Sequence, residues 1–322
     1  MIKGSEIRHD LISGNWVIIS PKRGKRPNDF KKNKKGAPCP FEDKISGHNV
    51  IVFYDNPKNW RVAVLENKYP AVIHGDGPIV KEKSRTYETL KGFGHHELVV
   101  TRSHKNNFPK LSPKEAIEVF KIFRERFMVL KKEKDVSYIS IFHNWGAAAG
   151  ASILHPHYQI LAVPIVPRTV GTSLENSERY FKKTGRCMHC RAISRELKEK
   201  KRIVFRNKSA IVIAPYVSRE PFQLRVYPLK HQSNMEETPD GELKDVALAL
   251  RTALLKLEKK IKKSDYNFFI HSAPVKNAKS FKHYHWHVEV LPKLNISAGF
   301  ELGTGIEINT VDPDEAAKIL RK

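Results

Sequence analysis

The order of structural signals in the first half of the chain recurs in the second half. In the first half, a strand-like segment at 62–67 leads to an apolar strand ending at His104, a helix, a strand at 139–144 and then His155-Pro156-His157. The second half repeats this order with 203–207, 222–230, His231, a helix, 268–271 and 283–287. His155 follows His104 by 51 residues, and His283 follows His231 by 52. This self-similarity indicates a divergent internal duplication, with His155 and His283 in equivalent places.

Helix and strand signals predict the same class of fold for each half. Ser112, Pro113 and Glu115 form the pattern of an N-cap, a first-turn proline and a capping box, and the segment 238–242 repeats it. The intervening apolar segments are rich in Val, Ile, Phe and Tyr and are bounded by Pro, Gly or Asn, which favours strands. We therefore expect an α+β fold of two domains, each an antiparallel sheet with packed helices, that meet near residues 167–186.

Composition excludes several classes of protein. With 322 residues and 40% hydrophobic content, the chain can bury sizeable cores. No apolar run approaches the ~20 residues of a spanning helix, and the sequence starts without an apolar signal region. Two of the three cysteines lie close together in Cys187-Met188-His189-Cys190, which fits metal ligation in a reducing compartment better than a disulfide framework. We expect a cytoplasmic protein with no membrane partner.

The net charge of +24 favours contact with polyanions but gives no function by itself. Lysines are spread along the chain, with one denser run at 31–35, and they do not interleave with aromatic residues as in single-strand binders. We interpret this charge as a solvated basic surface and expect no specific nucleic-acid partner.

Histidines alternate with other residues in two equivalent places. Because alternate side chains of a strand share a face, two trios are expected to project together: His155, His157 and Gln159, and His283, His285 and His287. Imidazoles on an apolar strand cost burial energy unless they bind a metal, a phosphate or each other. An isolated histidine is more often only satisfied or exposed, whereas the doubled pattern indicates a site.

The segment 144–152, Asn-Trp-Gly-Ala-Ala-Ala-Gly-Ala-Ser, precedes the first trio. Its small residues let backbone N–H groups approach an anion closely, so it is a candidate phosphate cradle. The second half has 273–277, Ala-Pro-Val-Lys-Asn, in its place. Phosphate binding is therefore predicted in the first half, and His285, placed as the equivalent of His157, is not expected to be catalytic.

From Asn144 through Ser152 to His155-Pro156-His157-x-Gln159, the sequence resembles the signature of galactose-1-phosphate uridylyltransferases, within the histidine triad superfamily. Further matches run in order along nearly the whole chain, at 8–10, 14–21, 23–27, 39–41, 66–70, 96–97, 285–289 and 298–305. The C-terminal matches also resemble the related ADP-glucose phosphorylases. The resemblance implies two tandem histidine-triad-like domains, with a catalytic domain at 1–170 and a second domain at 171–322.

The resemblance also implies a nucleotidyltransferase with a ping-pong mechanism. His157 is then the nucleophile that attacks the α-phosphorus of a nucleoside diphosphate sugar, and a hexose 1-phosphate resolves the adduct. The other implied roles are phosphoryl hydrogen bonding by Gln159, phosphate binding by Ser152 and Asn144, charge neutralisation by Arg23 and Arg26, and nucleoside contact by Asn67. Arg23 and Arg26 also fit a plain basic turn, and Asn67 fits a turn cap. Tyr158, where the family has a small residue, is expected to point to the other face of the strand.

The family pattern implies a structural zinc site in the first half, with Cys39, Glu42, His104 and His155 as its ligands. Glu42 departs from the pattern, which has a second cysteine there, although a carboxylate can bind zinc. In the second half, Cys187, Cys190, His231 and His283 supply two thiolates and two imidazoles, a set that suits tetrahedral zinc. A rival set for iron, implied by some family members, is Glu196, His271, His285 and His287. We favour the cysteine set because thiolates select zinc.

The reaction expected first is that of UDP-glucose with galactose 1-phosphate to give glucose 1-phosphate and UDP-galactose. An ADP-glucose phosphorylase that uses inorganic phosphate is the alternative, because the family's hexose-contacting glutamate is replaced within 303–307. A hydrolase of dinucleotides or phosphoramidates is less favoured, and a purely nucleic-acid-binding protein leaves 146–159 unexplained. The resemblance also implies a homodimer.

Overall fold

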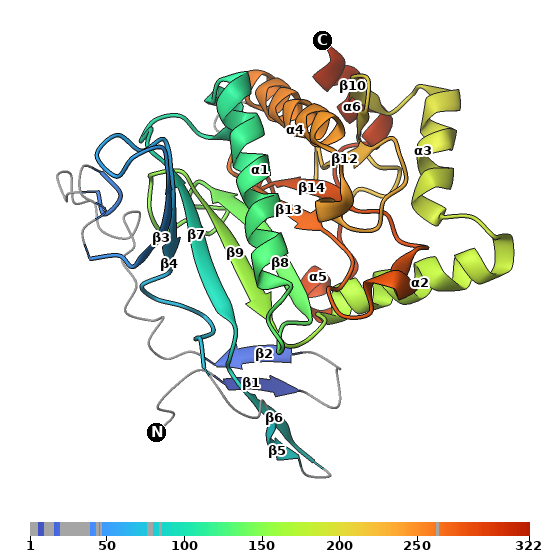
Figure 1. Cartoon of the computed structure of the whole chain (residues 1–322). Coiled ribbons are helices and arrows are strands. Elements are labelled where there is room, and N and C mark those ends of the chain that lie inside the picture. Colours follow the sequence, from blue (N-terminus) through green and yellow to red (C-terminus); the bar gives the residue numbers. More distant parts are fainter. Residues whose placement is uncertain are drawn as a thin grey trace.

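An antiparallel sheet of ten strands runs through both halves of the chain, within the residues that the structure describes (Figure 1). The structure is a computed structural model, and it describes residues 6–9, 16–19, 39–42, 45, 47–75, 80–83, 86–261 and 264–322. The strand order is β10-β11-β12-β14-β13-β8-β9-β7-β4-β3. The strands are β3 Val50–Tyr54, β4 Val62–Glu66, β7 His95–Thr101, β8 Tyr138–Trp145, β9 His157–Val163, β10 Ile203–Arg206, β11 Ala210–Ile213, β12 Leu224–Pro228, β13 Tyr266–His271 and β14 His287–Pro292.

The two halves of the chain contribute equivalent sets of five strands to the sheet, and the two sets are arranged in the same order from the centre of the sheet to its edges. Strands β8 and β13 pair at the centre, where Asn144 lies opposite Asn267. From there the first half continues as β9, β7, β4 and β3, and the second half continues as β14, β12, β11 and β10. This symmetry confirms the predicted α+β class and the internal duplication. The sheet and the main hydrophobic core both contain residues from before and after residue 170. The division into two domains at that residue therefore stays a prediction.

Two long helices cover one face of the sheet (Figure 1). They are α1, Pro113–Leu130, and α4, Asp240–Lys260, and they pack on each other over the sheet centre. The start of α1 is confirmed, because the Ser112 hydroxyl accepts from the Glu115 N–H while the Glu115 carboxylate accepts from the Ser112 N–H. The matching prediction for α4 was wrong: Pro239 is its N-cap, and the Thr238 hydroxyl donates to Gln232 Oε1 at 2.8 Å instead.

The opposite face of the sheet is covered differently in the two halves. In the second half, α3, Met188–Glu199, packs its Ile193 on strands β11 and β12. In the first half, Phe41 and Ile45 pack on β4 and β7. Strand β9 alternates between the faces: Tyr158 and Ile160 are buried under the helices, whereas His157 and Gln159 lie on the opposite face. The expected orientation of Tyr158 is confirmed.

The remaining elements lie around this sheet. A smaller antiparallel sheet has the order β2-β1-β6-β5, with β1 Glu6–His9, β2 Trp16–Ile19, β5 Val80–Lys83 and β6 Glu88–Lys91. The other helices are α2 Arg168–Thr184, α5 Gly299–Thr304 and α6 Pro313–Arg321, and the 3₁₀ turns are η2 Phe108–Lys110, η3 Met235–Glu237 and η4 Ala278–Phe281. Among the helices described, we find none with the length and apolar character needed to span a bilayer.

Candidate functional site

His157 is the first residue of β9 and lies at the wall of a cavity on the sheet face opposite α1. Its side chain is 7% exposed. Its Nδ1 lies 2.9 Å from the carbonyl oxygen of His155, and a carbonyl can only accept. Nδ1 therefore carries a proton in this hydrogen bond, and in the neutral ring the lone pair is on Nε2. Gln159, Ser152 and Asn67 line the same cavity, so the structure brings these four predicted site residues together.

The expected histidine trio of the first half does not form as one strand face. Because β9 begins at His157, His155 and Pro156 lie in the segment before the strand, where alternation does not apply. The His155 ring turns toward Cys39, with its Nδ1 at 3.5 Å from the Cys39 Sγ. His157 and Gln159 thus share the cavity without His155.

The loop after β8 has two left-handed glycines, Gly146 with φ +85° and Gly150 with φ +80°. Its N–H groups are largely used inside the protein. The Ala148 N–H donates to Asp265 Oδ2 at 2.7 Å, the Gly150 N–H to the Ala147 carbonyl at 3.0 Å, and the Ala151 N–H to the Gly146 carbonyl at 3.1 Å. These three groups cannot cradle a phosphate in this conformation, whereas Ser152 at the end of the loop lines the cavity.

Two residues of the second half hold this loop in place. Asp265, just before β13, accepts from the Ala148 N–H, and the Asn267 amide donates to Asn144 Oδ1 and to the Ala149 carbonyl, both at 2.8 Å. Asn144, predicted to bind phosphate, thus contacts Asn267, and the residues that line the cavity begin at Gly150. A function of the second half is therefore to support the loop that ends at the cavity.

We expect Gly146→Ala to destabilise the protein more than Gly150→Ala. Both changes place a side chain at positive φ, which costs about 1–2 kcal/mol. A Cβ at Gly146 would also lie 2.0 Å from Asp265 Oδ1, whereas nothing lies within 4 Å of a Cβ at Gly150. Since the clash disrupts the bond to Ala148, we expect Gly146→Ala to lower the free energy of unfolding by about 3–5 kcal/mol in urea titrations. Equal losses for the two variants would contradict this role of Asp265.

Some predicted residues lie outside the site as described, and some cavity residues were missed. Arg23 and Arg26 fall outside the described residues. The cavity also contains Phe41, whose ring centroid lies 5.6 Å from that of His157, and Lys68. Lys68 follows Asn67 directly and offers a cation for phosphate, which a search of the turn for basic residues could have found.

Cys39, His104 and His155 form the first group of possible metal ligands, with ligand atoms within 4.8 Å of one another. The His155 Nε2–H donates to the Thr101 carbonyl at 2.6 Å, which leaves Nδ1 facing the thiol. Burial lowers the pKa of His155 to about 4, so its ring is neutral, as a metal ligand requires. Glu42 lies beside this group, with Oε1 at 2.9 Å from His104 Nδ1.

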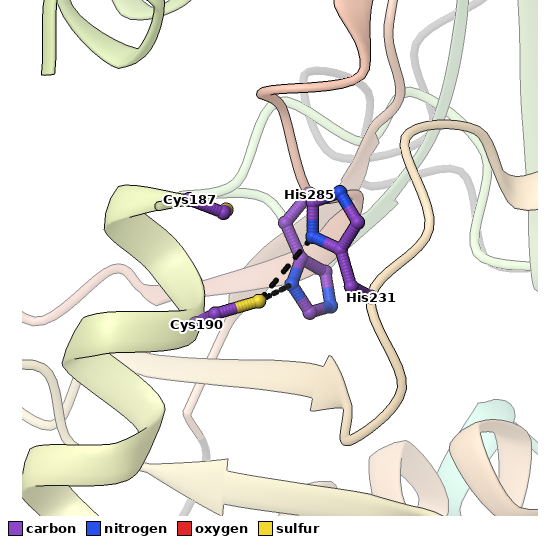
Figure 2. Close-up of side chains that lie close together, drawn as sticks. All are labelled: Cys187, Cys190, His231 and His285. Carbon is purple, nitrogen blue, oxygen red and sulfur yellow. Dashed lines mark hydrogen bonds between the residues drawn. The ribbon is translucent and has the colours of Figure 1, made fainter. Parts of the chain in front are cut away.

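The second group consists of Cys187, Cys190, His231 and His285 (Figure 2). Cys190 Sγ lies 3.3 Å from His231 Nδ1 and 3.4 Å from His285 Nδ1. The opposite nitrogens donate to backbone carbonyls, His231 Nε2 to Lys282 at 2.7 Å and His285 Nε2 to Pro228 at 3.1 Å. A hydrogen bond with Cys190 lowers the pKa of the Cys187 thiol, which favours a thiolate. Two sulfurs, two Nδ1 lone pairs and carbonyl-anchored rings fit a tetrahedral zinc ion.

This group corrects the predicted ligand set, because His285 takes the place of His283. The His283 ring lies instead near Phe281 and Phe181, with centroid distances of 6.1 Å and 6.4 Å. The physical reason is that the segment 272–286 between β13 and β14 is longer than the segment 146–156 between β8 and β9. Counting residues along the chain therefore paired His155 with the wrong histidine.

The same shift corrects the assignment of the second-half counterpart of His157. His287 Nδ1 lies 3.1 Å from the His285 carbonyl, just as His157 Nδ1 lies 2.9 Å from the His155 carbonyl. His287 also begins β14, as His157 begins β9. His287, and not His285, is thus the structural equivalent of His157.

Side chains pack around His287, whereas His157 lies at the wall of a cavity. The rings of His189, Tyr227 and His271 lie around it, with centroid distances of 5.1, 5.0 and 5.0 Å. Burial lowers the pKa of His287 well below its usual value. His189 lies between Cys187 and Cys190 in the sequence. The segment that carries the second metal group therefore also places a ring against His287, the equivalent of His157.

The predicted iron ligands are not brought together as one set. Glu196 forms a buried ion pair with Arg202 at 2.9 Å, and His285 belongs to the cysteine group. His271 and His287 lie close to Glu289 instead. The Glu289 carboxylate already accepts from the Gln223 amide at 2.7 Å and from Arg225 Nε at 3.3 Å. The neighbouring guanidinium disfavours a cation there.

Comparison with known proteins agrees with this geometry. A family model described as the N-terminal domain of galactose-1-phosphate uridyl transferase matches residues 1–167, and a second, described as a domain of unknown function (DUF4921), matches 94–321. An ADP-glucose phosphorylase of Arabidopsis thaliana is 32% identical, with 98% of this chain and 92% of that protein covered. A galactose-1-phosphate uridylyltransferase of Thermotoga maritima is 27% identical, with 98% of both covered.

Solved structures agree with the sequence comparisons. The crystal structure of an ADP-glucose phosphorylase from Arabidopsis thaliana with bound ADP-glucose has a TM-score of 0.78, 31% identity and 99% coverage of both chains. The family model matches the first half of the chain, and the relatives match over nearly its whole length. The chain therefore belongs to the galactose-1-phosphate uridyl transferase family.

Proposed function

We propose that this protein transfers a nucleoside monophosphate group from a nucleoside diphosphate sugar through a covalent adduct on His157. The observation that carries the proposal is the orientation of His157 at the cavity. Its Nδ1–H is held by the His155 carbonyl at 2.9 Å, and the ring shares the cavity with Ser152 and Gln159. A neutral imidazole whose Nδ1 carries the proton has its lone pair on Nε2, and such a ring is a competent nucleophile at phosphorus.

In the first step, the Nε2 lone pair forms a bond to the α-phosphorus, and the bond from that phosphorus to the bridging oxygen breaks. The sugar leaves as its 1-phosphate and takes the bonding electron pair. The ring then carries positive charge, which the hydrogen bond from Nδ1–H to the His155 carbonyl stabilises. In the second step, a phosphate oxygen of the acceptor attacks the phosphorus, the P–N bond breaks, and His157 is regenerated.

Two acceptors fit this chemistry. With galactose 1-phosphate, the reaction is uridylyl transfer from UDP-glucose, the activity named for the Thermotoga maritima relative. With inorganic phosphate, the products of ADP-glucose are ADP and glucose 1-phosphate. The higher identity to the Arabidopsis thaliana ADP-glucose phosphorylase favours this second candidate, 32% against 27% over a similar share of the chain.

A label-and-chase experiment distinguishes these candidates. The protein is incubated separately with UDP-glucose and ADP-glucose labelled at the α-phosphate, and the acid-labile label on the protein is measured. We expect label from one of the two, stable in buffer and released by galactose 1-phosphate or by phosphate. Rapid release by water alone would support a hydrolase, and no label from either substrate would contradict the adduct.

Zinc at the two metal groups is part of this proposal. A zinc ion in the first group would be structural, and it would stiffen the segment that carries His155, two residues before the nucleophile. Cys39, His104 and His155 would hold it, with Glu42 in reach of His104. The second ion would be held by Cys187, Cys190, His231 and His285. The two cysteine thiols in this set favour zinc over iron.

We also propose a homodimer in the cytoplasm. Apolar side chains between residues 294 and 308 are exposed, among them Ile296 at 95% and Leu302 at 77%. Exposed apolar side chains that gather in one segment favour a protein partner, and the family resemblance favours a second copy. The cytoplasmic location is supported by the three cysteines, all of them described in the structure, which form no disulfide with one another.

A further inference from the structure

His96 in strand β7 is buried behind the cavity, at 5% exposure, and hydrogen-bonds on both sides of its ring. On one side, the backbone N–H of Ala71 donates to His96 Nδ1 at 3.0 Å. A backbone N–H can only donate, so Nδ1 has no proton. The ring is therefore neutral, and its single proton is on Nε2.

On the other side, His96 Nε2 lies 3.0 Å from Gln159 Oε1. Since Nε2 carries the proton, the Gln159 atom that accepts must be its oxygen. The Gln159 nitrogen, with two N–H donors, is then the atom left to face the cavity that His157 shares. A phosphoryl oxygen needs a donor, whereas the Gln159 oxygen in that place would repel it.

His96 also holds the segment on the nucleoside side of the cavity. The Asn67 N–H donates to the His96 carbonyl at 2.8 Å, and the Asn67 side-chain oxygen accepts from the Tyr69 N–H at 2.9 Å. Asn67 and Tyr69 line the cavity. One residue thus connects the segment 67–71 to the amide of Gln159.

We propose that His96 is a positioning residue that fixes the Gln159 amide with its N–H groups toward the transferred phosphoryl group. The inference rests on the proposed transfer at His157. Without the Nε2–H of His96, the Gln159 amide can turn over and present its oxygen to the phosphate. The expected effect is a slower nucleotidyl transfer step. Because Asn67 Nδ2 also lies 3.1 Å from His96 Nε2, the step is measured at saturating nucleotide, where a change in affinity does not enter the rate.

Two substitutions separate the two sides of the ring. An asparagine amide reaches roughly the place of Nδ1, so His96→Asn keeps an acceptor for Ala71 and loses the donor to Gln159. A glutamine amide reaches roughly the place of Nε2, so His96→Gln restores a donor to Gln159. The control is His95→Asn, the same substitution one residue earlier, where the ring packs on His74 instead.

We expect His96→Asn to slow single-turnover nucleotidylation of His157 at saturating donor by about 10–100-fold. His96→Gln should recover most of the rate, and His95→Asn should match the parent protein. On a Gln159→Ala background, His96→Asn should cost less than about twofold further. The proposal would be overturned if the rate losses of His96→Asn and Gln159→Ala multiplied in the double variant. It would also be overturned if His96→Gln recovered none of the rate.

A second measurement does not depend on turnover. Nitrogen-15 NMR of the histidine rings reports which nitrogen carries the proton, and we expect the Nε2–H form for His96 at neutral pH. A proton on Nδ1 would overturn the proposal even if transfer occurs. Absence of any adduct in the parent protein would count against the proposed function, while the NMR result would still decide the state of His96.

Discussion

The His157→Ala variant is expected to form no nucleotidyl adduct and to lose on the order of 10⁴-fold or more in kcat. The reason is that the reaction needs a nucleophilic ring nitrogen at the cavity, and the hydrogen bond from Nδ1–H to the His155 carbonyl leaves that role to Nε2. Because His157 is at the edge of the cavity and outside the main core, the fold should survive the change. The measurement is kcat in steady state together with the unfolding midpoint of the same preparation.

The matched control is His287→Ala, which removes the second-half equivalent of His157. That ring is buried under His189 and Tyr227 and lies at no described cavity, so the variant should keep its transfer activity while losing stability. Comparable losses of kcat in the two variants would contradict the assignment of catalysis to the first half alone.

The Cys187→Ser variant is expected to lose one equivalent of bound metal per chain. Cys187 and Cys190 supply both sulfurs of the second group, and a serine hydroxyl is a much poorer ligand for zinc than a thiolate. Because metal binding is coupled to folding, the midpoint of thermal unfolding should fall by roughly 5–10 °C. Elemental analysis of the purified variant gives the metal content, and calorimetry gives the midpoint.

Two histidine variants serve as controls for the same site. His285→Ala should lose the same equivalent of metal, because His285 Nδ1 lies 3.4 Å from the Cys190 Sγ. His283→Ala should retain it, because the His283 ring lies near Phe281 and Phe181 and not in the metal group. Unchanged metal content in Cys187→Ser would contradict a metal site at this group. Loss of metal in His283→Ala would support His283 as a ligand, as predicted from the sequence.

Features set by neighbouring residues were predictable from the sequence. The capping box of α1 depends on contacts between Ser112 and Glu115, three residues apart. The opposite orientations of Tyr158 and Gln159 follow from strand alternation alone. The duplication was also readable, because the order of elements does not depend on the length of any one loop.

Features set by distant residues were not predictable in this way. The choice of His285 over His283 depends on where extra residues of the segment 272–286 are accommodated, which spacing along the chain does not reveal. The contact of Asp265 with Ala148 joins residues that are 117 positions apart. The pairing of His96 with Gln159 depends on the register of β7 against β9, which the apolar pattern leaves open.

Peptide mapping by mass spectrometry can identify the residue that carries the nucleotidyl group. The protein is incubated with UDP-glucose or ADP-glucose, quenched in alkali to preserve a P–N bond, digested and sequenced by fragmentation. We expect a mass increase of one nucleoside monophosphate on His157, reversed by the acceptor and absent from His157→Ala. An adduct on any other residue, or steady turnover with His157 unmodified throughout, would contradict it.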